Sequence, residues 1–144
     1  MSDELLVEKD GFIATLTLNR PDRLNAISVS MLDDLAAQLV ECDRDRDVRG
    51  IILTGAGRGF CAGLDLQDAT AGTGIGSGGG GPAVNLDLRD APPTVLHKID
   101  TPTICALNGG AAGYGMDLAL GCDIRIAGQS GKLAAAFTKR GVLP

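Results

Sequence analysis

The feature that most constrains this chain is residues 108–123, where an apolar run ends in a cluster of glycines and a short helical pattern follows. The four glycines within 109–115 permit a tight turn, and residues 116–120 predict one or two helical turns. Backbone N–H groups at a helix start lack partners, so the Tyr114 N–H is available to a negatively charged oxygen. Asp117 presents a carboxylate three residues later. This segment therefore predicts half of a site that stabilises an oxyanion.

A second segment of the same kind lies at residues 54–66, after the apolar end of a predicted strand. It is again rich in glycine and other small residues, so a ligand can approach the main chain closely. Two such turns can place two backbone N–H donors on one oxygen. Acyl chemistry requires such a pair of donors.

Four segments, taken together, resemble the enoyl-CoA hydratase/isomerase (crotonase) family. They are residues 18–26 (LNRPDRLNA), 59–66 (GFCAGLDL), 108–117 (NGGAAGYGMD) and 122–127 (CDIRIA). Each segment alone is a weak signal, because glycine-rich turns after strands occur in many α/β proteins. Their order and spacing are specific, and they extend over nearly the whole chain.

The resemblance implies an α/β fold, a crotonase-like spiral of repeated strand-strand-helix units. It also implies that the chain acts on a coenzyme A thioester, whose carbonyl oxygen is held by the N–H groups of Leu64 and Tyr114. Asp117 falls at the position of the family's first catalytic acid. The coenzyme is then part of the substrate, and we expect no separate cofactor. The positions that correspond to coenzyme A contacts in the family are Arg23, Leu24, Ala62, Leu64, Asp65, Leu66 and Tyr114.

The sequence departs from the family's hydratases at both catalytic acids. Hydratases commonly carry glutamate at the position of Asp117 and a second glutamate further on, where this chain has Phe137. A phenyl ring cannot transfer a proton. Enoyl-CoA hydration remains the expected reaction, and two alternatives stay open: isomerisation of an enoyl-CoA with a single carboxylate, or an acyl-CoA-binding fragment without catalysis.

Length and composition set further expectations. Family members are considerably longer than 144 residues, so we expect one incomplete spiral domain over 1–144 that lacks the C-terminal helical part. Within it, residues 70–82 predict a flexible glycine-rich loop. If the complete chain is present, the resemblance implies a homo-oligomer, a trimer or hexamer.

Charge and cysteine usage exclude several classes of partner. The net charge of −5 and scattered basic residues argue against nucleic acid. No apolar stretch approaches the roughly 20 residues that span a bilayer. The four cysteines show no metal-binding or Cys-x-x-Cys spacing, and no leader precedes the first strand, so we expect a cytoplasmic protein without a metal site.

Hydrophobic periodicity predicts the remaining elements. They are strands at 12–18, 48–53, 103–107 and 124–127, a hairpin partner at 5–7, a helix from Ser28 or Ser30 to Arg44, and a helix at 94–99. Outside the site, His97 is expected to be a surface or packing residue and not a base. Cys61 is not expected to be a nucleophile, since no histidine stands near it in the motif. Asp123 and Arg125 are expected to pair with each other or to cap strand ends.

Overall fold

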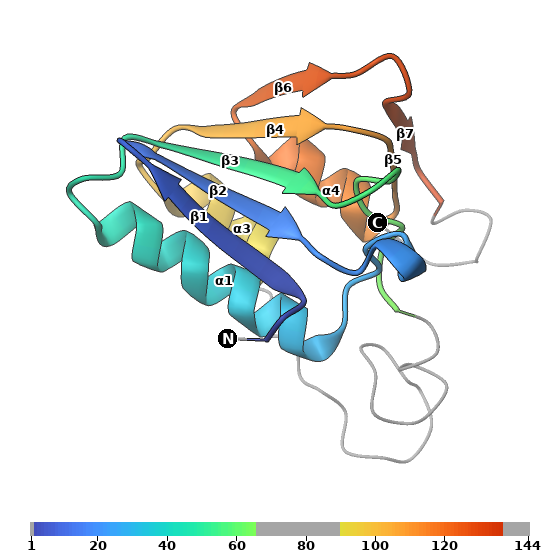
Figure 1. Ribbon diagram of the computed structural model, residues 1–144, viewed down its shortest axis with the longest axis horizontal. Coiled ribbons are helices and arrows are strands. Elements are labelled where there is room, and N and C mark those ends of the chain that lie inside the picture. The colour runs from blue at the N-terminus through green and yellow to red at the C-terminus, as the bar shows by residue number, and fades with distance from the viewer. Residues whose placement is uncertain (1, 66–89, 137–144) are drawn as a thin grey trace.

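The computed structural model describes residues 2–65 and 90–136, which form a five-stranded sheet with helices on one side and a small two-stranded sheet (Figure 1). The strands are β1 (Leu5–Asp10), β2 (Ile13–Leu18), β3 (Gly50–Gly55), β4 (Thr103–Leu107), β5 (Gly110–Ala112), β6 (Ile124–Ala127) and β7 (Lys132–Ala134), and the helices are the short 3-10 helix η1 (Pro21–Arg23), α1 (Val29–Arg44), α3 (Pro92–Lys98) and α4 (Tyr114–Gly121). The expected α/β class is confirmed.

The large sheet has the order β1-β2-β3-β4-β6. β1 and β2 form the predicted antiparallel hairpin, and the other neighbouring strands are parallel. Alternate residues of β2, β3 and β4 are buried, as expected for a sheet with one face against a core. The predicted strand at 48–53 is displaced by two residues from the observed β3. Val48 and Arg49 precede the strand: the Val48 N–H closes the turn after α1 by donating to the Asp45 oxygen, and the Arg49 N–H donates to the Phe12 oxygen.

Helix α1 connects β2 to β3 and supplies much of the core. The Ser28 hydroxyl accepts a hydrogen bond from the Met31 N–H at 3.1 Å, so Ser28 is the N-cap and Ser30 is not. Its buried face consists of Met31, Leu32, Leu35, Leu39 and Cys42. Helix α3 contacts both α1 and α4, so the three helices form one layer under the sheet (Figure 1). Helix α3 begins at Pro92, two residues before the predicted start, because proline is well tolerated in the first helical turn.

The chain repeats a strand-strand-helix order in β1-β2-α1 and again in β4-β5-α4. The second strand of the later unit, β5, corrects the prediction of a plain turn through 109–115. It has only three residues, and its partners are distant in sequence: β7 on one side and Cys61 on the other. Neither partner is apparent from a glycine-rich stretch read locally. In the described ranges, no helix has the length and apolar character needed to cross a bilayer.

Candidate active site at the junction of two glycine-rich turns

The turn after β3 is held by an asparagine from the loop that follows β2. Asn25 is fully buried at a φ of 55°, a left-handed conformation that asparagine tolerates better than most residues. Its side chain accepts from the Arg20 N–H at 2.8 Å and donates to the carbonyl oxygens of Ala56 and Gly59, both at 2.9 Å. The loop after β2 and the turn after β3 are therefore fixed to each other.

A second asparagine, at the end of β4, holds the same turn. The Asn108 side chain accepts from the Gly55 N–H at 3.2 Å and donates to the carbonyl oxygens of Gly57 at 3.0 Å and Gly59 at 3.2 Å. Neither Asn25 nor Asn108 was predicted to have a role. For Asn108 the signal was present, since it directly follows an apolar strand and begins a segment rich in glycine. Asn25 lies in a stretch without glycine, and its role depends on the distant turn that it binds.

The two glycine-rich turns predicted from the sequence lie side by side. Cys61 forms a bridge with β5, in which the Cys61 N–H donates to the Gly110 oxygen at 3.1 Å and the Ala112 N–H donates to the Cys61 oxygen at 3.0 Å. A Cβ atom on Gly115 would lie 2.3 Å from the Cys61 oxygen, so only glycine allows α4 to approach this closely. The approach brings the start of α4 against residues 61–64.

Both predicted oxyanion donors lie at this junction. Gly63 directly precedes Leu64 and has a φ of 101°. A Cβ atom built on Gly63 would lie 3.6 Å from the Tyr114 nitrogen, so the first residue of α4 lies close to Gly63. Ile27 forms its backbone hydrogen bonds with the two neighbours of Leu64: the Ile27 N–H donates to the Gly63 oxygen, and the Asp65 N–H donates to the Ile27 oxygen. The Leu64 N–H therefore faces away from Ile27. Neither the Leu64 nor the Tyr114 N–H donates a hydrogen bond to any residue within 2–65 and 90–136. Two unused donors on adjacent turns match what an oxyanion requires.

Asp117 lies one helical turn after Tyr114. Its side chain is half-buried, and burial raises the pKa of its carboxyl group above the ordinary value. A raised pKa brings a carboxylate closer to the range in which it can both take and release a proton near neutral pH. Asp117 is thus a titratable group with a raised pKa, one helical turn from the Tyr114 N–H.

The Asp65 carboxylate forms ion pairs with two arginines. This carboxylate, 4% exposed, lies 3.0 Å from the Arg23 Nη2 and 3.0 Å from the Arg20 Nη2, and Arg20 also contacts Glu4 at 3.0 Å. These ion pairs connect the loop after β2 to the segment that follows Leu64. A structural role for Asp65 agrees with this geometry, and direct contact with coenzyme A stays a prediction.

The other predicted coenzyme A positions are brought together only in part. Leu24 and Ala62 are exposed neighbours, since the Ala62 N–H donates to the Leu24 oxygen at 2.9 Å. Leu24 has a φ of 50°, a strained conformation of the kind that clusters at functional sites. Leu66, Phe137 and the predicted loop at 70–82 lie outside the described residues.

Four further residues, His97, Cys61, Asp123 and Arg125, were not expected to take part in catalysis. His97 is exposed on α3, and burial raises the pKa of the Cys61 thiol to about 12, so its nucleophilic thiolate is not populated near neutral pH. Asp123 caps the start of β4, accepting from the Thr103 N–H at 2.7 Å. The Arg125 guanidinium donates instead to backbone oxygens, so it does not pair with Asp123. Within 2–65 and 90–136, no three side chains of His, Cys, Asp or Glu are grouped to hold a metal ion.

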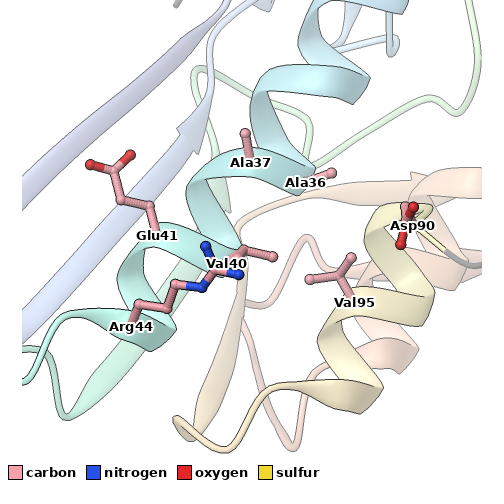
Figure 2. Close-up of a pocket in the computed structure, with 7 residues that line it drawn as sticks. All are labelled: Ala36, Ala37, Val40, Glu41, Arg44, Asp90 and Val95. Carbon is pink, nitrogen blue, oxygen red and sulfur yellow. The ribbon is translucent and has the colours of Figure 1, made fainter.

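A pocket of about 470 Å³ lies elsewhere, between α1 and α3 (Figure 2). It is lined by Ala36, Ala37, Val40, Glu41, Arg44, Asp90 and Val95, of which none belongs to the two glycine-rich turns. None of these residues was predicted to belong to the site, so this pocket is separate from the turn junction.

Comparison with known proteins gives a consistent result. The sequence profile described as enoyl-CoA hydratase/isomerase matches residues 8–144. The chain is 45% identical to 1,2-epoxyphenylacetyl-CoA isomerase of Escherichia coli (strain K12), covering 100% of this chain and 55% of that protein. It is 40% identical to a probable enoyl-CoA hydratase, EchA14, of Mycobacterium tuberculosis (strain ATCC 25618 / H37Rv), covering 99% of this chain and 54% of that protein.

Solved structures agree with the sequence relatives. The chain superposes on a probable enoyl-CoA hydratase/isomerase from Mycobacterium abscessus with a TM-score of 0.82 at 34% identity, covering 98% of this chain and 52% of that one. An enoyl-CoA hydratase from Mycobacterium avium gives a TM-score of 0.80 at 34% identity, and the match covers 99% of this chain and 55% of that one. The chain spans about half the length of the curated relatives it matches.

Proposed function

Because the chain belongs to the enoyl-CoA hydratase/isomerase family and shares its crotonase-like fold, we propose that it acts on an acyl-CoA thioester and stabilises the enolate formed from it. The observation that carries this proposal is the pair of unused N–H groups on Leu64 and Tyr114 at the junction of two turns. As the thioester carbonyl oxygen gains negative charge, both N–H groups would donate to it. Removal of one such donor typically costs about 3 to 4 kcal/mol of activation free energy.

The proposed reaction is hydration of an enoyl-CoA, with Asp117 as the acid/base group. The Asp117 carboxylate takes a proton from water as the water oxygen bonds to C3 of the acyl chain. The electrons of the double bond move into the enolate, and a proton then returns to C2. The raised pKa of Asp117 supports this role, because one group must both accept and give up the proton.

Isomerisation of the double bond is the second candidate function. Asp117 would take a proton from one carbon of the acyl chain and return it to another, so a single carboxylate suffices. One implication of the resemblance favours it: Phe137 falls at the position where the family's hydratases carry a second glutamate.

The proposal extends to the binding partners of the site. Arg23, Leu24, Ala62, Leu64, Asp65, Leu66 and Tyr114 are proposed to contact the coenzyme A part of the substrate, and no further cofactor is required. Four free, buried cysteines suit a reducing compartment such as the cytoplasm. For the complete chain, a homo-oligomer, a trimer or hexamer, is also proposed. Exposed apolar side chains on and near β6 and β7, those of Leu120, Ile124, Ile126 and Leu133, are suited to burial against another surface.

The test is turnover of crotonyl-CoA, followed by the loss of its conjugated enoyl-thioester absorbance, with a 3-enoyl-CoA assayed in parallel for isomerisation. Asp117→Asn should abolish whichever activity is present and retain binding of the thioester. Asp33→Asn is the matched control, because Asp33 is an exposed aspartate on α1 with no contact to the turn junction among the described residues.

The outcomes separate the candidates. Loss of crotonyl-CoA turnover in Asp117→Asn alone supports hydration, and conversion of the 3-enoyl-CoA alone supports isomerisation. A folded chain that binds acyl-CoA without converting either substrate would be the binding fragment that the sequence left open. Equal activity in Asp117→Asn and the unaltered chain would overturn the role of Asp117.

A further inference from the structure

Gly63 is held by hydrogen bonds on both of its polar backbone groups. Its N–H donates to the Cys61 Sγ at 3.4 Å, and its oxygen accepts from the Ile27 N–H at 2.8 Å. The Cys61 thiol also lies 4.0 Å from the same Gly63 oxygen. Glycine has a wider choice of backbone conformations than any other residue, so these contacts fix the turn at the Gly63 φ of 101°.

The direction of the Leu64 N–H depends on this arrangement. The Leu64 N–H and the Gly63 oxygen belong to one planar peptide group, and in a trans peptide they point in opposite directions. The Gly63 N–H belongs to the preceding peptide group, which the Cys61 sulfur holds. Without the bond to sulfur, that group could rotate about the Gly63 torsions, and the Leu64 N–H would lose its fixed direction.

Cys61 also connects this turn to the other proposed donor. Its backbone forms hydrogen bonds with Gly110 and Ala112 of β5, and β5 ends two residues before Tyr114. Cys61 therefore contacts, through its backbone, the strand that leads to Tyr114 and, through its sulfur, the glycine that precedes Leu64. The spacing of the two N–H donors depends on this one residue.

The chemical state of the thiol suits such a structural contact. Cys61 is fully buried, and burial raises the pKa of its thiol to about 12, so the sulfur stays protonated and neutral. A neutral thiol accepts a weak hydrogen bond through its sulfur. It does so without placing a negative charge next to the site where the enolate would form.

We propose that the Cys61 side chain is a positioning residue of the oxyanion site: its sulfur holds Gly63 so that the Leu64 N–H points at the oxygen that the Tyr114 N–H also binds. This inference rests on the proposed function and extends it to a side chain that does not touch the substrate. Donors stabilise an oxyanion best when they are aligned before the charge develops, so their misalignment lowers the rate more than it weakens substrate binding.

The experiment compares Cys61→Ala, Cys61→Ser and Cys105→Ala with the unaltered chain, on whichever enoyl-CoA is converted. Alanine removes the acceptor and keeps the backbone bonds, whereas serine retains an acceptor. Cys105→Ala is the control, since it removes an equally buried thiol from β4. We expect Cys61→Ala to lower kcat by about three- to tenfold, as the loss of one weak hydrogen bond gives, with KM little changed. Cys61→Ser and Cys105→Ala should keep the kcat of the unaltered chain.

A second measurement does not depend on turnover. Two donors on the carbonyl oxygen of a thioester weaken its C=O bond, so the infrared stretching frequency of butyryl-CoA, isotope-labelled at the carbonyl carbon, should fall when it binds. The fall should be smaller in Cys61→Ala and complete in Cys61→Ser. If Cys61→Ala does not fold, a folded Cys61→Ser in which the fall is lost would still overturn the inference.

The remaining outcomes separate this inference from the proposed function. The same kcat and the same frequency in Cys61→Ala and the unaltered chain would overturn the role of Cys61 alone. An equal loss in Cys105→Ala would do so too, because the effect would then follow from any buried thiol. A folded, unaltered chain that does not bind butyryl-CoA, or binds it without a fall in frequency, would overturn the proposed oxyanion site and this inference with it.

Discussion

The side-chain amides of Asn25 and Asn108 donate to the same acceptor, the carbonyl oxygen of Gly59, at 2.9 and 3.2 Å. The two asparagines are far apart in sequence: Asn25 lies in the loop after β2, and Asn108 directly follows β4. Between them they also bind Ala56 and Gly57, so the whole turn after β3 is fixed. Because this turn leads directly into residues 61–64, the position of the Leu64 N–H depends on both side chains.

The first prediction concerns these asparagines. Asn25→Ala should lower the free energy of unfolding by about 2 to 4 kcal/mol, because it leaves buried partners unpaired and puts alanine in a left-handed conformation. Asn25→Gly isolates the lost hydrogen bonds, since glycine adopts that φ without strain. Asn108→Ala should cost less, because Asn108 is only half-buried. Urea unfolding of the single and double variants checks this, and additive effects would argue against a shared role at Gly59.

The second prediction concerns the approach of α4 to the Cys61 turn. Gly115→Ala would place a Cβ atom 2.3 Å from the Cys61 oxygen, so α4 has to move away, at a cost of about 1 to 3 kcal/mol in stability. The movement also separates the Leu64 and Tyr114 N–H groups and should reduce turnover. Gly110→Ala is the control, since its Cβ meets nothing within 4 Å. Thermal unfolding and the crotonyl-CoA assay should distinguish the two variants, and equal tolerance of both would refute the close approach.

The third prediction concerns pH. Burial raises the pKa of Asp117 in the folded state, so folding favours its protonated form. The free energy of unfolding should therefore fall as pH rises from the ordinary aspartate pKa through the raised value, and Asp117→Asn should remove this dependence. If Asp117 first acts as a base, kcat/KM should decline as pH falls through the same raised pKa. The free energy of unfolding and kcat/KM, each measured as a function of pH, check the two expected directions. A decline of kcat/KM only near the ordinary pKa of aspartate would contradict the role of the raised pKa.

The fourth prediction separates the two arginines of the Asp65 cluster. Arg20 is 16% exposed and also contacts Glu4 and the Ala26 oxygen, whereas the Arg23 side chain is 41% exposed. Arg20→Ala should therefore cost several times more stability than Arg23→Ala. Asp65→Ala should cost about 3 to 5 kcal/mol, because a buried ion pair loses one partner.

Arg23→Ala also tests coenzyme A binding. If Arg23 contacts the coenzyme, the variant should remain folded and bind acyl-CoA less tightly, with a weaker dependence of affinity on salt. Titration of the unaltered chain and of Arg23→Ala with acyl-CoA at two ionic strengths measures both the affinity and its salt dependence. An unchanged affinity would leave Arg23 with the structural role alone.

The sequence predicted most of the fold because its signals are local. The helix α1 and the alternation in β2 follow from helix and strand periodicity, and the structure confirms both. The sequence left Ser28 and Ser30 open as the N-cap, and the structure selects Ser28. The candidate site was predicted on different grounds: a glycine cluster after each of two strands, and a resemblance in four segments. The glycine-rich turn and helix start indicated Tyr114 and Asp117, and the resemblance added Leu64. The structure brings all three to one junction. Their catalytic roles stay predictions.

What the sequence missed depends on partners that lie far along the chain. Strand β5 is recognisable only beside β7 and Cys61, and Asp65 is recognisable as an ion-paired group only beside Arg20 and Arg23. By itself, the sequence determined which residue types and local conformations are present, since these depend on neighbours a few residues away. The tertiary structure alone decided which polar groups are paired, buried or left free, because that depends on atoms that folding brings together from distant parts of the chain.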